Sequence, residues 1–413
     1  MGLLQIGAVL VSLAAVLAFF NYRVVGLPTT IGVMLLSLVV SAALVAADFF
    51  GVLDIREQTG AWWLAIDFNK TLMDGMLSFL LFAGALQVNL GDLWKHRFSI
   101  GVLASVGVVL STAIIGGVTY VVAPFLGFEL PLVFCLLFGA LISPTDPIAV
   151  LALLKRAGVS SELETNITGE SLFNDGVAVV VFLALLGLTG AGHVETAGEI
   201  ALLFVQEVAG GVLLGLALGA LAFWMLRQMD DHQVEILVTL AVVLGGYQLA
   251  TALHASGPLA MVVAGLLIGN QGRMFAMSET TRAHLDIFWE IVDEILNTVL
   301  FVMIGLEMIQ ITLDGRYLLA GVLAIPLVLI TRYGCVSVAL QLVRPWHRLG
   351  DNASALLTWA GLRGGISVAL ALALPAGEAR DTIVTITYCV VLFSIVGQGL
   401  TVGPVIRRLG RGD

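Results

Sequence analysis

Two groups of acidic, hydroxyl and amide residues lie inside long apolar stretches of this chain. The first reads Ser143-Pro144-Thr145-Asp146-Pro147, and the second reads Glu170-Ser171-Leu172-Phe173-Asn174-Asp175-Gly176. Ionisable side chains at the depth of a lipid bilayer are costly, and they usually mark the path of an ion or a proton. We therefore expect Asp146 and Asp175 to carry the chemistry of this protein, with a purely structural role as the alternative.

These residues offer oxygen ligands for a small cation. A buried carboxylate resists ionisation, so it can hold a proton or a cation but not both at once. Hard monovalent cations prefer oxygen ligands, as other hard ions do, and the carboxylates of Asp146 and Asp175 would suit Na⁺ or Li⁺. The hydroxyls of Thr145 and Ser171 add neutral ligands, together with backbone carbonyls freed by the prolines. Competition between H⁺ and a metal ion at one such site is enough to couple their movements in opposite directions.

Helical spacing places four of these residues on two adjoining faces. At about 100° per residue, Ser171 shares a face with Asp175, and Glu170 shares the neighbouring face with Asn174. Ser171 can therefore orient Asp175 by a hydrogen bond. Asn174 cannot ionise, so it offers only an uncharged amide.

The composition indicates that these groups sit in a membrane protein. Only 12% of the 413 residues are charged and 59% are hydrophobic, whereas a soluble domain carries about 25% charged residues. The 46 glycines suit close helix packing in a bilayer. A net charge of −10 without a long basic run argues against a nucleic-acid partner. Cys135, Cys335 and Cys389 lie in apolar stretches and indicate neither a disulfide framework nor a resident metal, and we expect no cofactor.

Thirteen apolar stretches predict an all-α polytopic fold, because a helix needs roughly 20 residues to cross a bilayer. They cover about residues 3–20, 30–50, 71–90, 99–124, 131–153, 166–189, 199–226, 234–253, 257–270, 285–310, 317–343, 354–374 and 382–405. The ninth is short and could be re-entrant. No basic residue precedes the first, which favours a retained helix over a cleaved signal. The stretches leave no segment long enough for a soluble regulatory domain.

The basic residues orient these stretches. Thirteen of the 19 Lys and Arg residues lie in the odd-numbered connections and the C-terminal tail, and four lie in the even-numbered connections. The positive-inside rule then predicts a cytoplasmic C-terminus and an N-terminus outside. Asp146 lies nine residues before Lys155, and Asp175 nine residues after Asn166. Both carboxylates are thus about 13 Å from the cytoplasmic edge, near the middle of a ~30 Å core.

Two of the stretches contain helix-breaking residues in their middle. Pro144 and Pro147 interrupt the fifth, because proline lacks an N–H and clashes with the preceding turn. The glycines of Gly361-Leu362-Arg363-Gly364-Gly365 weaken the twelfth. The two stretches are seven apart and run in opposite directions, which predicts two inverted six-helix repeats with a binding site at the breaks. Simple kinks are the alternative.

Two arginines inside apolar stretches carry positive charges that need a partner. Arg332 lies too deep to reach either interface, so we expect it to pair with Glu170, or otherwise with Glu307, in a structural contact. Arg363 either compensates freed helix ends or tunes the ion site. Asn297 either joins an ion path or bonds a neighbouring helix. The acidic residues of the tenth stretch form a solvated face or a cation-attracting funnel; they are Asp286, Glu290, Asp293 and Glu294.

In order and spacing, the three motifs resemble those of the cation/proton antiporter superfamily, in its NhaP-like branch related to eukaryotic sodium/proton exchangers. The segment 169–176 is the most specific of them, and the resemblance covers essentially the whole chain. It implies about thirteen helices with discontinuous crossing helices, a homodimer, a mobile core domain and a static dimerisation domain. The core would comprise about 99–190 and 317–405, and the dimerisation domain about 1–90 and 199–310.

The resemblance also implies roles for individual residues. Its ion-binding residues are Asp175, Asn174, Thr145 and Asp146, with Glu170 and Arg332 as a stabilising pair. Members with Asn-Asp rather than Asp-Asp at this place typically exchange one H⁺ for one Na⁺, and Asn174 cannot carry a second proton. One departure is Ala83, where many relatives carry an acidic residue. This difference leaves ion preference and pH response open.

The expected function is electroneutral antiport of Na⁺ or Li⁺ against H⁺ by a transporter, not an enzyme, in a bacterial or archaeal inner membrane. Its partners would be the cation, the proton, membrane lipid and a second copy of the chain. K⁺/H⁺ exchange is the close alternative, because residue types do not specify cavity geometry. An intramembrane aspartyl hydrolase could use Asp146 and Asp175 as a dyad, but the chain lacks the usual Gly-x-Gly-Asp signature. A channel is the other alternative.

Overall fold

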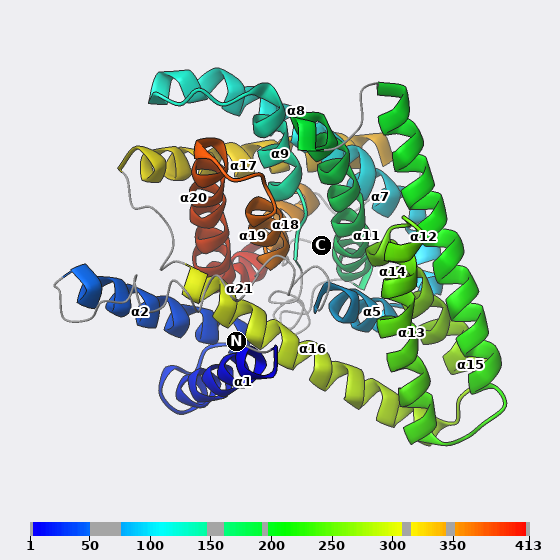
Figure 1. Ribbon diagram of the computed structural model, residues 1–413. Coiled ribbons are helices and arrows are strands. Elements are labelled where there is room, and N and C mark those ends of the chain that lie inside the picture. The colour runs from blue at the N-terminus through cyan, green and yellow to red at the C-terminus, as the bar shows by residue number, and fades with distance from the viewer. Residues whose placement is uncertain are drawn as a thin grey trace.

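The computed structural model describes residues 3–49, 76–146, 161–191, 197–307, 315–343 and 352–409. These residues form a bundle of helices (Figure 1). Their single isolated β-bridge joins Asp146 to Leu362. Several residues used in the sequence analysis lie outside the described residues: Arg56, Lys70, Pro147, Lys155, Arg156, Arg344, Arg348 and Arg411.

The described helices overlap every predicted apolar stretch. In the first half they are α1 Leu3–Phe20, α2 Thr29–Phe49, α5 Leu77–Gln87, α6 Leu90–Lys95, α7 Arg97–Gly101, α8 Gly107–Val122, α9 Leu132–Ile142, α11 Ser161–Leu186 and α12 Ala197–Leu226. In the second half they are α13 His232–Ala252, α14 Gly257–Leu267, α15 Arg273–Phe275, α16 Glu279–Glu307, α17 Gly315–Val343, α18 Ala353–Ala360, α19 Gly365–Leu372, α20 Glu378–Leu392 and α21 Gly399–Leu409. Short π-helical turns, Val102–Val106 and Phe393–Gln398, join α7 to α8 and α20 to α21.

Local capping explains several helix starts. The Asp231 side chain accepts hydrogen bonds from the first turn of α13, and Ser256 caps α14, which has a proline in its first turn. α16 begins at Glu279, six residues before the predicted stretch, because its first six residues, Glu-Thr-Thr-Arg-Ala-His, are mostly polar and are therefore missed by an apolar pattern.

Seven described helical segments are both long and apolar enough to cross a membrane: Gly7–Val25, Arg97–Leu126, Glu162–Thr189, Val205–Leu226, His232–Ala252, Gly315–Val343 and Glu378–Leu409. Shorter apolar helices lie at Ile31–Ala47, Leu77–Gln87, Leu132–Ile142 and Gly257–Gly272. The protein is therefore an all-helical, polytopic membrane protein.

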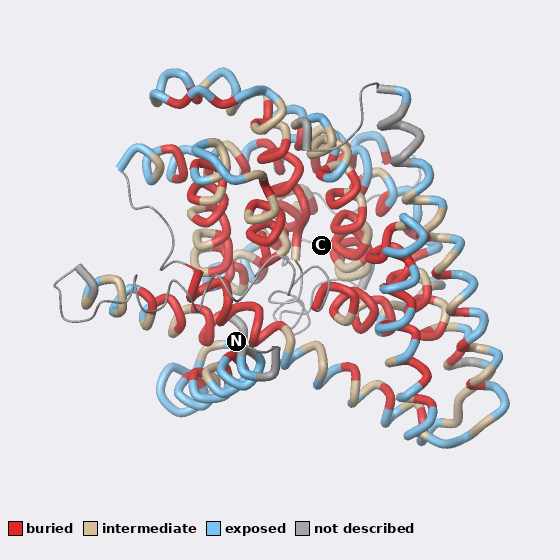
Figure 2. Tube along the Cα trace, in the orientation of Figure 1, coloured by how far each residue is buried: buried red, intermediate tan, exposed pale blue. Residues whose placement is uncertain are grey.

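The outer helices expose apolar side chains, as expected against lipid. Trp224 of α12 is 61% exposed and Ile330 of α17 is 72% exposed. Figure 2 shows the buried residues concentrated in the middle of the bundle, with exposed positions along the outer faces of α12 and α13. Since lipid tails are about as apolar as leucine, such faces need no further cover in a bilayer.

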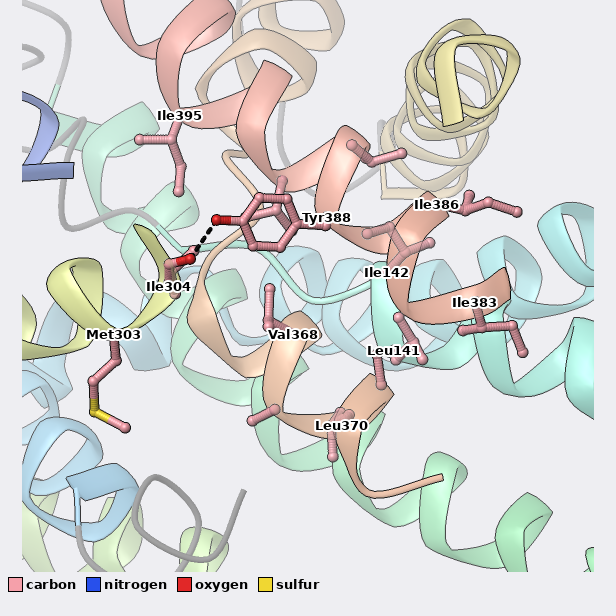
Figure 3. Packing of buried hydrophobic residues seen from close by; sticks show 14 of the residues in the cluster. Leu141, Ile142, Met303, Ile304, Val368, Leu370, Ile383, Ile386, Tyr388 and Ile395 are labelled. Carbon is pink, nitrogen blue, oxygen red and sulfur yellow. Dashed lines mark hydrogen bonds between the residues drawn. The ribbon is translucent and has the colours of Figure 1, made fainter. Parts of the chain in front are cut away.

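A buried apolar cluster holds the interrupted helices in place (Figure 3). It includes Leu141 and Ile142 of α9, Met303 and Ile304 of α16, Val368 and Leu370 of α19, and Ile383 and Ile386 of α20. The Tyr388 hydroxyl of α20 donates a hydrogen bond to the Ile304 carbonyl of α16. α8 and α9 touch through their backbones, since a Cβ added at Gly139 would lie 2.4 Å from the Thr112 carbonyl oxygen. These contacts fix where the end of α9 meets α19.

Candidate functional site

Two helix interruptions cross in the middle of the bundle. α9 ends at Ile142, and Ser143–Asp146 continues without helical structure. α18 ends at Ala360, and α19 begins at Gly365. The Asp146 amide donates to the Leu362 carbonyl at 2.7 Å, so the two interrupted segments run antiparallel where they meet. The break expected at the glycines is therefore present, and α9 ends just before Pro144, where the prolines predict a break. The residues that directly follow Asp146 lie outside the described residues.

Arg363 compensates the freed end of α9. Its Nη1 donates to the carbonyl oxygens of Ser143 and Pro144, at 2.6 and 2.8 Å. Arg363 is only 3% exposed. A positive charge at a helix C-terminus is favourable, since carbonyl dipoles accumulate there. Two roles were expected for Arg363, compensation of freed helix ends or tuning of the ion site. The contacts observed are those of the first role.

α11 supplies the polar residues that line the other side of Thr145. Asn174 Nδ2 donates to the Thr145 hydroxyl oxygen at 2.8 Å, and the Thr145 amide points to Asn174 Oδ1 at 3.4 Å. The Ser171 hydroxyl donates to the Thr145 carbonyl. All three residues are buried. Ser171 and Asn174 of α11 therefore contact Thr145 in the segment after α9, as expected for residues of one site. The Ser171 hydroxyl, however, bonds to Thr145 and not to Asp175.

The two carboxylates of the site lie within electrostatic range of each other. Asp175 is 9% exposed and interacts with the charges of Asp146 and Arg363. Asp146 is half-buried, and a Cβ added at Gly364 would lie 2.7 Å from its Oδ2. Only glycine fits there without moving the carboxylate. The arrangement gathers two carboxylates and two hydroxyls, which is an oxygen-rich set suited to a hard monovalent cation.

A buried ion pair stands beside the site. Arg332 of α17 contacts the Glu170 carboxylate of α11, and the side chains are 6% and 1% exposed. Because Glu170 lies one residue before Ser171 on α11, this pair ties the ion-site helix to α17. Glu307, the second candidate partner, instead interacts with the charge of Arg380.

Two residues of the site were not expected from the sequence. Ser394 Oγ accepts from the Arg363 amide at 2.8 Å and donates to Gln398 Oε1 at 2.7 Å. Both are buried. Their i, i+4 spacing inside an apolar stretch was a usable signal, since buried polar side chains in membrane helices need partners.

Interrupted helices that cross in the middle of a polytopic bundle, with carboxylates at the crossing, define a secondary ion transporter. The chain belongs to the sodium/hydrogen exchanger family, whose transmembrane model matches residues 9–408. The resemblance to cation/proton antiporters that the motifs indicated is thereby confirmed.

Named relatives agree with this assignment. The chain is 47% identical, over its full length, to the Na⁺/H⁺ antiporter NhaP of Pseudomonas aeruginosa, and it covers 98% of that protein. It is 38% identical to the Na⁺/H⁺ antiporter NhaH of Halobacillus dabanensis, with 83% of this chain and 84% of the relative covered. The fold matches the solved structure of the sodium proton antiporter MjNhaP1 from Methanocaldococcus jannaschii with a TM-score of 0.75, over 99% of both chains at 19% identity.

Proposed function

We propose that this protein exchanges Na⁺ or Li⁺ for H⁺ across the membrane, with the ion and the proton competing for Asp175. One observation carries the proposal: Asp146, which pairs with Leu362 where the two segments meet, interacts electrostatically with Asp175, and the neighbouring Thr145 is hydrogen-bonded to Ser171 and Asn174 of the same helix as Asp175. The names of the relatives support Na⁺ as the cation. Asp146 would be the second charged ligand.

The exchange is proposed to be electroneutral. Asn174 binds Thr145 through its amide and carries no titratable proton. Asp175 therefore alternates between one proton and one monovalent cation, so that each half-cycle moves the same charge. Glu170 and Arg332 hold α11 against α17 without taking part in the transfer.

The wider architecture is also proposed. Thirteen membrane crossings form two inverted six-helix repeats, with the N-terminus outside and the C-terminus in the cytoplasm of the cell that carries the protein in its inner membrane. A core domain of about 99–190 and 317–405 moves in an elevator-like step against a dimerisation domain of about 1–90 and 199–310. Two copies pair through the latter. This division is what the resemblance to the sodium/hydrogen exchanger family implies.

The alternatives make different predictions. K⁺/H⁺ exchange would use the same ligands, but the relatives at 47% and 38% identity are both named Na⁺/H⁺ antiporters. A hydrolase using the two aspartates would cleave a peptide in detergent, whereas an antiporter would not. A channel would pass current, whereas an electroneutral exchanger passes none.

A proteoliposome assay with an internal pH dye tests the proposal. An imposed pH gradient is challenged with Na⁺, Li⁺ or K⁺, with and without a clamped membrane potential. The wild type is expected to dissipate the gradient with Na⁺ and Li⁺, independently of the potential. Asp175→Asn is expected to be inactive, while Glu162→Gln, an exposed position on the same helix, retains exchange.

Three outcomes would contradict parts of the proposal. Exchange by Asp175→Asn at the wild-type rate would refute the site. Dissipation by K⁺ alone would move the protein to the potassium alternative. A strong dependence on the potential would refute the uncharged role of Asn174.

A further inference from the structure

One face of α16 leads from the surface of the bundle to the crossing. Glu290, Asp293 and Asn297 follow one another at spacings of three and four residues, which places them on one face of the helix. Along this face Glu290 is exposed, Asp293 is half-buried and Asn297 is 1% exposed. Polar side chains therefore follow one face of α16 from an exposed position to a buried one.

The end of this path meets the ion site. Leu300, three residues beyond Asn297, packs against Gly365, since a Cβ added at that glycine would lie 2.6 Å from the leucine side chain. Gly365 begins α19, directly after the segment that touches Asp146. Asp293 and Asp146 also interact electrostatically. α16 thus presents its buried polar turn to the crossing.

Two oxygens on this turn lack partners. Asn297 Nδ2 donates to the Asp293 backbone carbonyl at 2.9 Å, so the amide lies along the turn that carries Asp293. Among the described residues, Asn297 Oδ1 and Asp293 Oδ1 are both buried and accept no hydrogen bond. Buried acceptors without partners are rare in folded proteins, and each calls for a ligand or an ordered water.

Of the acidic residues in the described part of α16, only Asp293 has a buried side-chain oxygen without a hydrogen-bond partner. Asp286 forms an ion pair with Arg273. Glu294 is exposed and lies about 100° around the helix from Asp293. On α16 the buried oxygens without partners therefore belong to Asp293 and Asn297. These two buried oxygens are not part of a solvated acidic face.

We propose that the Asp293 carboxylate and the Asn297 carbonyl form a second binding subsite for the transported monovalent cation, occupied before the ion passes to Asp146 and Asp175. The inference rests on the proposed function, because the ligand is the exchanger's own substrate.

The test is the apparent KM for Na⁺ in proteoliposomes at fixed pH. Asp293→Asn is expected to raise this KM on the order of tenfold, with the maximal rate changed less than about twofold, because one charged ligand is lost. Asn297→Leu is also expected to raise the KM for Na⁺, because the side-chain carbonyl is lost. Glu294→Gln is the matched control and retains the wild-type KM. The combination of Asp293→Asn with Asn297→Asp moves the carboxylate by one turn and is expected to recover most of the affinity.

Added salt distinguishes long-range electrostatic attraction of the cation from direct ligation by Asp293. At about 1 M choline chloride the screening length falls to roughly 3 Å, so a KM difference caused by surface charge disappears, whereas that of a direct ligand persists. The subsite is refuted if Asp293→Asn keeps the wild-type KM, if Glu294→Gln raises the KM equally, or if the difference vanishes at high salt. A wild type that shows no Na⁺-driven exchange overturns the proposed function instead, so the two failures are distinguishable.

Discussion

Removing one partner of the Glu170–Arg332 pair is expected to destabilise the protein far more than removing both. The two side chains are 1% and 6% exposed, so neither charge can recover its hydration when the other is lost. Breaking a buried pair by a single substitution costs about 3–5 kcal/mol, whereas replacing both partners by apolar residues of similar volume is often close to neutral. Glu170→Leu, Arg332→Met and the double variant together form the test.

The magnitude can be expressed as a melting temperature. An unfolding entropy of about 2.1 cal/mol/K per residue over 413 residues gives roughly 0.9 kcal/mol/K. A loss of about 3–5 kcal/mol then lowers the Tm by roughly 3–6 °C for each single variant. The double variant is expected within about 2 °C of the wild type.

Heating in detergent followed by fluorescence-detected size-exclusion chromatography gives the four Tm values of this cycle. The control is Lys95→Met, which removes the exposed pair with Asp92, whose side chains are 70% and 38% exposed. Such a surface pair contributes at most about 1 kcal/mol, so its Tm shift is expected near 1 °C. If the two single shifts at the buried pair simply add in the double variant, the residues are not coupled and the reasoning is wrong.

Two further perturbations test the crossing and the α12–α13 connection. Gly364→Ala is expected to slow exchange by roughly 5- to 100-fold in proteoliposomes, because its Cβ would lie 2.7 Å from Asp146 Oδ2 and overpacking costs about 1–3 kcal/mol. Hydrogen bonds from the Ser278 and Thr281 hydroxyls lower the pKa of Asp230 below its ordinary value of 3.8. The stabilisation that follows is complete above that ordinary value and is lost as the pH falls through the lowered one. The Tm difference between the wild type and Thr281→Val is therefore expected to shrink below about pH 4 in melting curves recorded across pH.

The substitution at Gly364 has a control within the chain. Gly334→Ala changes a glycine of α17 with no neighbour within 4 Å of the added Cβ, so exchange is expected to be unchanged and the helix slightly more stable. A wild-type exchange rate in Gly364→Ala would show that the carboxylate at the crossing need not stay where the structure holds it. A Tm difference that is constant with pH would contradict the account of Asp230.

The fold was predictable from the sequence to the extent that the bilayer dictates it. Apolar length identified the helices, because a span must be long and must satisfy its own backbone. α16 shows the limit: its first six residues are mostly polar, so hydropathy missed the start at Glu279. Proline and glycine indicated that two spans are interrupted, but not that the Asp146 amide meets the Leu362 carbonyl. That register depends on the packing of the whole cluster around α9 and α19.

Motif residues of the site were predicted better than their contacts. Thr145 and Asn174 were named from the sequence, and they are in contact. Helical spacing suggested that Ser171 would orient Asp175, yet its hydroxyl is used by the Thr145 carbonyl. Spacing on one helix cannot foresee a carbonyl freed on another. Ser394 was missed for the same reason, since its partner is a backbone amide beside a break.

The freed backbone groups at the crossing are largely taken by the protein itself. Arg363 occupies the Ser143 and Pro144 carbonyls, and Asp146 occupies that of Leu362. Carbonyls already accepting a hydrogen bond are weaker ligands, so the cation must rely on carboxylate and hydroxyl oxygens more than the proline break alone suggests.

The proposed stoichiometry depends on Asn174 adding no charge to the crossing, since its amide donates to the Thr145 hydroxyl oxygen and cannot ionise. Asn174→Asp adds one titratable carboxyl group beside Asp175. Exchange by this variant is expected to depend on the membrane potential in proteoliposomes, because the two carboxylates together can release more charge per cycle than one cation replaces. Exchange that stays independent of the potential in Asn174→Asp would contradict the role proposed for Asn174.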